Sequence, residues 1–281
     1  MSREIRQKLA FALLTVAAAV VVVPVLLVAG YIIWRGAGAI SPEFLLSAPR
    51  SGLKEGGIFP AAVGTVILTL GTAIVALPLG VAAAIYLSEY ARDDLLTRLI
   101  RMAIINLAGI PSVVYGLFGL GLFVLFLRCG TSILAGSLTL GLLTLPVVIS
   151  TAEEAIRSVP QSFRVVSVSL GGTKWQTIRH VVLPNALPGI ITGVILGLER
   201  AAGETAPILF TVAAVYLPRL PRSIFDQTMA LPYHLFVIST QVPGMPVTLQ
   251  FGTALVLLAF VLSLNAAATI IRSRFRRRRL W

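Results

Sequence analysis

The sequence predicts an all-α, polytopic membrane protein with six transmembrane helices. Of its 281 residues, 57% are hydrophobic and only 12% are charged, and the mean hydropathy is +0.93. Soluble domains carry about twice this share of charged residues. Several apolar runs also reach the ~20 residues that a helix needs to cross a bilayer. Charged residues gather between these runs, as expected of the loops between membrane spans.

The apolar runs give the order of the predicted helices. The first run is longer than the ~7–15 apolar residues of a signal peptide, so we interpret it as an uncleaved helix. Pro78 lies inside the second run, where neighbouring helices can accommodate a kink. The third and fourth runs are almost contiguous and are expected to form a tight helical hairpin. The six predicted spans are 9–34, 61–87, 102–127, 131–149, 186–216 and 251–271.

The basic residues predict the orientation. Sixteen of the 23 Lys and Arg residues lie in segments on the N-terminal side of the spans, and six lie on the opposite side. Cytoplasmic loops carry the excess of basic residues, so both termini are predicted to face the cytoplasm. An even number of spans also returns the chain to its starting side. The predicted location is the cell (inner) membrane, which the chain crosses several times.

Composition disfavours several functional classes. The net charge is +12, but the arginines of residues 272–279 directly follow an apolar run. This arrangement is typical of an anchor at anionic membrane lipid and not of a nucleic-acid site. The single cysteine, Cys129, excludes an internal disulfide and a cysteine-based metal site. His180 and His234 stand far apart in the sequence, so we expect no metal site.

The sequence also lacks the elements of an enzyme. It contains no G-x-x-x-x-G-K-[ST] loop to hold a nucleotide phosphate, and GGTK at 171–174 has the wrong order and spacing. Glu153 and Glu154 are adjacent and point apart on a helix, so we interpret them as a solvated face and not as an acid–base pair. We therefore expect no catalytic residue and no cofactor in this chain. Work against a gradient would draw on an ion gradient or on another polypeptide.

Residues 153–216 organise the predicted function. The first part, up to Pro184, is charged and too polar to cross a bilayer. The fifth span follows, and it carries Glu199, Arg200 and Glu204. Each such charge is costly inside a membrane unless it is paired or faces a cavity. A polar hairpin that leads into a charged span suggests a device that couples a soluble partner to a path through the membrane.

The polar hairpin allows two interpretations. The pair Gly171 and Gly172 predicts a sharp break with a conformation that other residues rarely adopt. A short amphipathic helix with Lys174 and Trp175 follows, and Pro184 is expected to close it. Such a helix can lie on the bilayer surface. Alternatively, it docks into a groove of a partner protein with Trp175 as its anchor.

The same segment resembles the cytoplasmic signature of binding-protein-dependent ABC importer permeases, E-A-A-x-x-x-G followed, after nine residues, by I-x-L-P. Gly171, Val181, Leu183 and Pro184 match its second half. The chain also resembles phosphate permeases of the PstA type over most of residues 56–270, in motifs that agree in order and spacing. These motifs are GGIFPAAVGT (56–65), LPLGVAAAIYLSEYA (77–91), NLAGIPSVVYGLF (106–118), VPQSFR (159–164), LGGTKWQTIRHVVLP (170–184) and GETAPILF (203–210).

The sequence departs from the signature at its first residue. Counting back from Gly171, the E-A-A triplet falls on residues 165–167, and Val165 occupies the position of the glutamate. In the family this acid helps to hold the loop and its contact with the ATPase. Either another acid, such as Glu153 or Glu154, replaces it, or the contact depends more on packing.

The resemblance implies the MetI-like core of a type I ABC importer permease and three parts of the chain. These parts are an N-terminal transmembrane helix with the first external loop (1–60), a type-1 permease domain (61–271) and a basic cytoplasmic tail (272–281). The chain would form the path for phosphate together with a second, PstC-like permease. Two PstB-like ATPases, which bind ATP and Mg²⁺, and an external PstS-like phosphate-binding protein would complete the importer.

The resemblance also implies which residues couple transport to ATP. The expected coupling residues are Gly171, Gly172, Thr173, Lys174, Trp175, Leu183 and Pro184. One alternative is a permease for another oxyanion, such as sulfate or molybdate. A further alternative is a secondary transporter driven by an ion gradient, in which the charges of the fifth span would form a proton relay. Such transporters usually show inverted repeats, and this sequence shows none.

The charges of the fifth span are the expected residues of the translocation path and its gating. Arg200 and Glu204 are four residues apart and can pair on one helix face, whereas Glu199 projects about 100° away toward another neighbour. The pair either joins helices or lines the path, where the guanidinium fork of Arg200 suits phosphate. Two acids against one base argue against tight binding of an anion.

Overall fold

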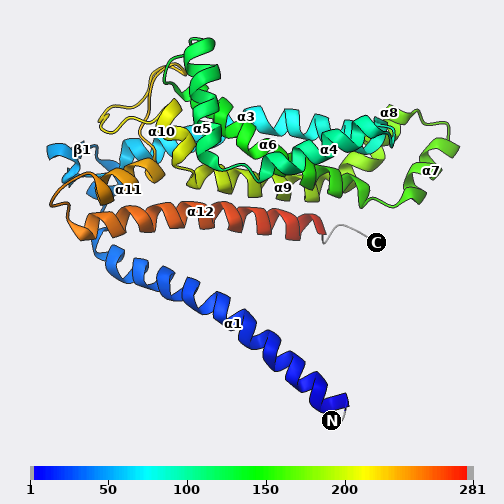
Figure 1. The fold of residues 1–281 in the computed structure, drawn as a ribbon, viewed down its shortest axis with the longest axis horizontal. Helices are drawn as coiled ribbons and strands as arrows, with labels where there is room; N and C mark the ends of the chain where they lie inside the picture. Colours follow the sequence, from blue (N-terminus) through cyan, green and yellow to red (C-terminus); the bar gives the residue numbers. More distant parts are fainter. Residues whose placement is uncertain (1–2, 277–281) are drawn as a thin grey trace.

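A computed structural model describes residues 3–276 of the chain, which fold mostly into helices (Figure 1). The long helices are α1 (Arg3–Gly36), α3 (Phe59–Ile85), α4 (Leu95–Ala108), α6 (Ile133–Arg157), α9 (Leu183–Gly203) and α12 (Val247–Arg276). The shorter helices are α2 (Pro42–Leu46), α5 (Ser112–Gly119), α7 (Gln161–Ser169), α8 (Lys174–Thr177), α10 (Ala206–Thr211) and α11 (Leu231–Thr240).

Tighter and wider helical turns complete the architecture. Three π-helical turns, η3 (Tyr86–Tyr90), η4 (Leu120–Phe126) and η5 (Ile178–Val182), continue α3, α5 and α8. The 3₁₀ turns η1 (Ala37–Ala39) and η2 (Ser51–Leu53) lie between α1 and α3. The strands β1 (Pro49–Arg50) and β2 (Glu55–Gly56) form a small antiparallel hairpin that pairs Pro49 with Gly56.

The helical fold class is confirmed. Five helices in the described chain are long and apolar enough to cross a membrane, or six if α4 and α5 count as one bent span. In Figure 1, α3, α6 and α9 lie together in the bundle, α12 runs along it, and α1 diverges from it. No residue in the most apolar stretch of α1 is buried in the single chain, as expected of a helix that is apolar on all sides and lies in a membrane.

The third predicted span, 102–127, corresponds to a bent pair of helices. The structure has two helices, α4 and α5, that meet at an angle of 102°. The chain breaks at residues 109–111 because Pro111 disfavours the helical conformation at the residue before it. Helix α4 also begins earlier than expected, at Asp94, whose Oδ1 accepts a 2.8 Å hydrogen bond from the N–H of Thr97. This bond lowers the pKa of the Asp94 carboxyl below its ordinary value.

The fifth predicted span, 186–216, is wrong in its bounds. Its helix begins at Lys174 and ends at Gly203, where Glu204 adopts an extended conformation. Pro207 explains this end, since it has no N–H to donate to the carbonyl of Gly203 and its ring would clash there. The chain resumes a helix in α10, which packs against α5.

The bundle core depends on close approach of helices and on hydroxyl groups that find acceptors in their own helix. Gly193 of α9 lies directly against the side chain of Thr151 in α6, so no Cβ fits there without a shift. In α3, Thr65, Thr69 and Thr72 each donate a 2.8 Å hydrogen bond to the carbonyl four residues earlier. These bonds satisfy polar groups that water cannot reach in an apolar bundle.

Gly193→Ala tests the packing of α9 on α6. The added methyl group collides with Thr151, and overpacking of this kind costs about 1–3 kcal/mol of stability. We expect a lower midpoint of thermal unfolding for the detergent-solubilised protein. Gly30→Ala is the matched control, because Gly30 lies in α1 with open space around it and alanine favours the helix by about 1 kcal/mol. Equal midpoints for the two variants would contradict the close approach.

Candidate functional site

The segment between α6 and α9 forms a helical hairpin at one end of the bundle (Figure 1). We call α7, residues 170–173 and α8 the α7–α8 hairpin. Gly171 reverses the chain with φ +85°, and the N–H of Gly172 donates a 3.0 Å hydrogen bond to the carbonyl of Ser167. This pattern is a Schellman motif, for which glycine is the favoured residue. The predicted break with a positive φ at Gly171 is therefore confirmed.

The second limb of the hairpin begins at a capping box and continues into the bundle. The side chain of Thr173 accepts from the N–H of Gln176, and Gln176 Oε1 accepts from the N–H of Thr173 at 2.8 Å. The helix then passes through η5 into α9, so the expectation that Pro184 closes it is wrong. The wider π-helical turn, in which Leu183 donates to Ile178, absorbs the missing N–H of the proline without a break.

The outer face of the hairpin is apolar and exposed. No residue of α7 is fully buried, although Phe163 packs partly against the core, and Leu170 at the end of α7 is 84% exposed. Trp175 of α8 is also exposed, and so are Val165, Val166 and Val168 of α7. Of these valines, Val168 also lines the cavity on the inner face. Sequence analysis identified Trp175 as an anchor but missed these neighbours, because three valines in nine residues also fit a buried helix. An exposed apolar surface of this kind is typical of a contact with another protein or with a membrane surface.

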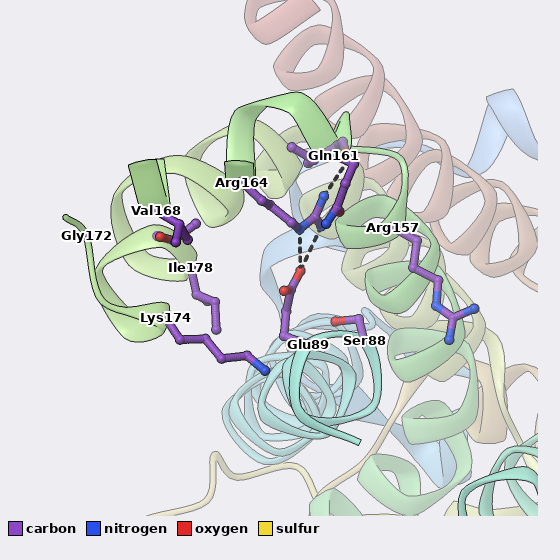
Figure 2. Close-up of a pocket in the computed structure, with 11 residues that line it drawn as sticks. Ser88, Glu89, Arg157, Gln161, Arg164, Val168, Gly172, Lys174 and Ile178 are labelled. Atoms are coloured by element: carbon purple, nitrogen blue, oxygen red, sulfur yellow. Dashed lines mark hydrogen bonds and ion pairs between the residues drawn. The ribbon is translucent and has the colours of Figure 1, made fainter. Parts of the chain in front are cut away.

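The inner face of the hairpin borders a cavity of about 660 Å³, which is lined by charged residues and by Val159, Val168 and Ile178. Figure 2 shows Glu89 of η3 on one side of this cavity, directed at Arg164 of α7. Arg164 Nη2 lies 2.7 Å from Glu89 Oε1, and the two side chains are only 15% and 10% exposed. Removing one partner of a pair this deeply placed typically costs about 3–5 kcal/mol, because the other charge is left uncompensated.

A second ion-pair group lies beside this cavity and corrects the interpretation of Glu153. Glu153 is no solvated residue, since its side chain is 13% exposed and contacts Arg101 of α4 at 3.0 Å and Arg157 at 2.9 Å. Glu154 is exposed, as expected. Neither acid holds the hairpin through an ion pair within the described residues. The acid that contacts α7 is Glu89, which lies 75 residues away in sequence.

The charges of the fifth span gather near the far end of α9. Arg200 Nε lies 3.4 Å from Glu204 Oε1, which confirms the predicted pair. The Arg200 side chain is 37% exposed and that of Glu204 is 16% exposed. Glu199 points elsewhere, as expected, and its Oε2 accepts a 2.8 Å hydrogen bond from Asn265 of α12. Arg200 and Glu204 thus pair with each other, whereas Glu199 joins α9 to α12.

Nothing in the described part of the chain is arranged for catalysis on a metal. Within residues 3–276, no group of three or more His, Cys, Asp and Glu residues is placed to hold a metal ion. The site therefore consists of two separated parts, the α7–α8 hairpin and the Arg200–Glu204 pair. The continuous helix from Lys174 to Gly203 connects the two parts. Along this helix, Lys174 and Arg200 lie about 39 Å apart at ~1.5 Å per residue.

Known proteins resemble this chain over most of its length. The family of binding-protein-dependent transport system inner membrane components matches residues 76–279. The probable ABC transporter permease protein YqgI of Bacillus subtilis (strain 168) is 34% identical over 282 residues, which cover 95% of each chain. Phosphate transport system permease protein PstA 1 of Mycobacterium tuberculosis (strain ATCC 25618 / H37Rv) is 38% identical over 225 residues, 80% of this chain and 72% of the relative.

Two solved structures share the fold. The first, from the MetNI methionine ABC transporter in an inward-facing conformation, has a TM-score of 0.62 and 16% identity, and covers 76% of this chain and 94% of its own. The second belongs to a bacterial ABC transporter that imports the acidic polysaccharide alginate. It has a TM-score of 0.64 and 13% identity, and covers 95% and 96% of the two chains. These likenesses confirm the predicted type of permease fold.

Gly171→Val tests the reversal between α7 and α8. A β-branched residue is strained at φ +85°, whereas asparagine tolerates this region, so Gly171→Asn is the matched control. We expect Gly171→Val to break the hydrogen bond between Gly172 and Ser167 and to raise amide hydrogen exchange over residues 161–180 by at least about tenfold, since local opening costs less free energy. Equal exchange in the two variants would show that the reversal does not depend on glycine.

Proposed function

Because the chain belongs to the family of binding-protein-dependent transport system inner membrane components, we propose that it is the permease subunit of an ATP-driven phosphate importer. The observation that carries the proposal is the set of relatives named as PstA permeases of phosphate transport, which are 32–38% identical over about four fifths of the chain. Family membership supports ATP and not an ion gradient as the energy source.

Transport by such a permease needs further subunits. A permease of this family works in a system with an external binding protein and an ATPase, since the chain itself has no nucleotide-binding loop. We propose that the importer also contains a PstC-like second permease, two PstB-like ATPases that hold ATP and Mg²⁺, and a PstS-like phosphate-binding protein. Each of these would supply what the chain lacks: the second half of the path, the chemical energy and the capture of phosphate.

The α7–α8 hairpin supplies the contact with the ATPase in this proposal. Its outer apolar residues, with Leu170 at the tip and Trp175 beside it, are exposed in the single chain and form a compact surface for a protein groove. Val165 lies on this outer surface, so the missing glutamate of the signature would face the ATPase and not the bundle. Packing of valines would replace its polar contact.

The orientation of the chain agrees with this arrangement. In Figure 1 the last turns of α12 point toward the end of the bundle that carries α7 and α8, and α1 runs toward the opposite end from its start. With the ATPase in the cytoplasm, both termini would lie on the cytoplasmic side. Arg272 and Arg274 at the end of α12 then meet the anionic leaflet, while the arginines at 277–279 lie outside the described residues.

Arg200 and Glu204 are assigned to the translocation path and its gate. Arg200 is partly exposed although α9 is a membrane helix, so in the assembled importer it would face a polar path, since exposure to lipid is costly. Its single ion pair at 3.4 Å leaves guanidinium donors for a passing phosphate. Glu204 competes for those donors, which favours release of phosphate over tight binding.

Radiolabelled phosphate uptake in a strain that lacks this gene tests the proposed function. We expect uptake to return with the wild-type chain, and excess unlabelled sulfate or molybdate to leave it unchanged. The ATPase should co-purify with the chain. Uptake of sulfate or molybdate in place of phosphate would assign a different oxyanion, and transport that persists without ATP hydrolysis would contradict an ABC importer.

Arg200→Gln tests the path. The substitution removes the charge but keeps a polar side chain, so we expect uptake to fall by at least about 100-fold, as usual when a charged hydrogen-bonding group worth ~3 kcal/mol is lost. The ATPase should remain bound. Arg98→Gln is the control, because Arg98 is exposed and forms a surface ion pair with Asp93. Normal uptake by an inserted Arg200→Gln protein would remove Arg200 from the path.

Glu204→Gln tests the gate. The substitution should change the rate of transport more than the half-saturating phosphate concentration.

A further inference from the structure

The π-helical turn η3 at the end of α3 contacts both limbs of the α7–α8 hairpin. Its Glu89 binds Arg164 of α7, and the ring of its Tyr90 lies 4.7 Å from Lys174 Nζ of α8. Two adjacent residues of one turn thus hold the two limbs. π-Helical turns are rare and often occur at functional sites, and here the wider turn brings both side chains to the hairpin.

Arg164 is fixed by acceptors from two different elements. Its Nε and Nη2 both donate to Glu89 Oε1, at 3.1 and 2.7 Å. Nη1 donates to the carbonyl of Val159 at 2.6 Å, and Nη2 also donates to the carbonyl of Ile156 at 2.9 Å. These carbonyls lie at the negative end of the α6 dipole, which favours a cation. Arg164 therefore joins α7 both to the end of α6 and to the end of α3.

Polar contacts carry the connection of the first limb to α3. Phe163 packs α7 against the core near the end of α6, whereas a cavity of about 660 Å³ lies between the hairpin and η3 beside the Arg164–Glu89 pair. Figure 2 shows Glu89 and Lys174 reaching into this cavity from opposite sides. A displacement of α7 relative to η3 is therefore carried by these polar contacts.

The other side of η3 is held as firmly. Arg101 of α4 donates a 2.7 Å hydrogen bond to the carbonyl of Leu87, and it also pairs with Glu153 of α6. Leu87 itself is buried. A force on Glu89 is thus passed to the backbone of η3, and from there to α3 and α4.

The cavity does not present itself as a site for an anion. Arg164 uses its donors on Glu89 and on two carbonyls, and Arg157 pairs with Glu153. Lys174 lies over the ring of Tyr90. Each of these three basic side chains thus already has a partner within the protein and is not available to hold an anion.

We propose that η3 is the joint through which the α7–α8 hairpin moves α3, with Glu89 as its positioning residue. The inference rests on the proposed function, in which the hairpin binds the ATPase. Closure of the ATPase would displace α7, and the Arg164–Glu89 pair would pass that displacement to α3. Helix α9 is moved directly, because it continues from α8. The joint thus makes one hairpin move two helices together.

Glu89→Gln tests the joint in the importer reconstituted with its ATPase and binding protein. The amide keeps the size of the side chain but removes its charge, and Arg164 retains its carbonyl acceptors. We expect the ATPase to stay bound with normal basal hydrolysis. The phosphate imported per ATP hydrolysed should fall about tenfold, within the usual range of coupling between two sites. Amide exchange over residues 161–172 should become faster.

Two sets of variants distinguish a positioning role of η3 from general destabilisation of the protein. Tyr90→Phe keeps the ring under Lys174 and should behave as wild type, whereas Tyr90→Leu should lower the same ratio. Asp93→Asn is matched to Glu89→Gln, because Asp93 forms an ion pair with Arg98 on the exposed loop that follows η3, and it should leave the ratio unchanged.

The results that would contradict the role of η3 differ from those that would contradict the proposed phosphate import. An unchanged ratio of phosphate to ATP in Glu89→Gln overturns the joint, whatever the exchange shows. Loss of the ATPase from the variant complex also overturns it, since Glu89 would then serve assembly. If the wild-type importer takes up no phosphate, the proposed function fails. In that case, amide exchange over residues 161–172 in the intact complex still tests the role of η3. Equal exchange in the wild-type and Glu89→Gln complexes would contradict that role.

Discussion

A polar group in an apolar bundle is costly unless it finds a partner inside the protein, and this constraint influences where the chain can place its charges. An unsatisfied group in the hydrocarbon region costs several kcal/mol. Thr72, fully buried, therefore bonds the carbonyl of Leu68 in its own helix, and Glu199 takes Asn265 from α12. Arg164 collects acceptors from both η3 and the end of α6. Each of these choices joins particular helices, so satisfying polar groups also determines which helices move together.

The same constraint determines how prolines are placed. Pro184 falls just after a π-helical turn, which keeps the helix from Lys174 to Gly203 continuous over 30 residues. The chain breaks near Pro111 and Pro207, whereas Pro78 and Pro146 lie inside the continuous helices α3 and α6. The breaks allow α5 and α10 to pack against each other beside α6. Two sequence motifs, residues 106–118 and 203–210, thereby meet in space although they lie about a hundred residues apart.

Much of the fold could be predicted from the sequence because apolar runs report membrane helices directly. The reversal at Gly171 and the pair of Arg200 and Glu204 could also be predicted, since both depend on local geometry. The bend at Pro111 and the end of α9 were missed because apolar composition continues through both. Their signals were local, namely the residue before a proline and the proline four residues after Gly203.

The Glu89–Arg164 pair could not have been predicted in the same way. Its residues lie on different elements 75 positions apart, and no periodicity relates them. Without coordinates, the acids nearest to the hairpin in sequence were the natural candidates for the role of the missing glutamate. Glu153 is instead occupied by Arg101 and Arg157. Tertiary packing alone decides which carboxylate meets the arginine.

The two parts of the site are connected by two helices and not by one. Helix α9 runs from the α7–α8 hairpin to Arg200, and α3 runs from Glu89 back toward Thr65, about 36 Å away at ~1.5 Å per residue. At that far end, Thr65 and Thr69 of α3 line the same small cavity as Ala201 and Glu204. A hairpin that held only α9 would shift Glu204 against a stationary α3 and strain this contact. A hairpin that contacts both α3 and α9 displaces together the residues of these two helices that surround Glu204. The Arg200–Glu204 pair is then the element free to rearrange, because it depends on one long contact of 3.4 Å.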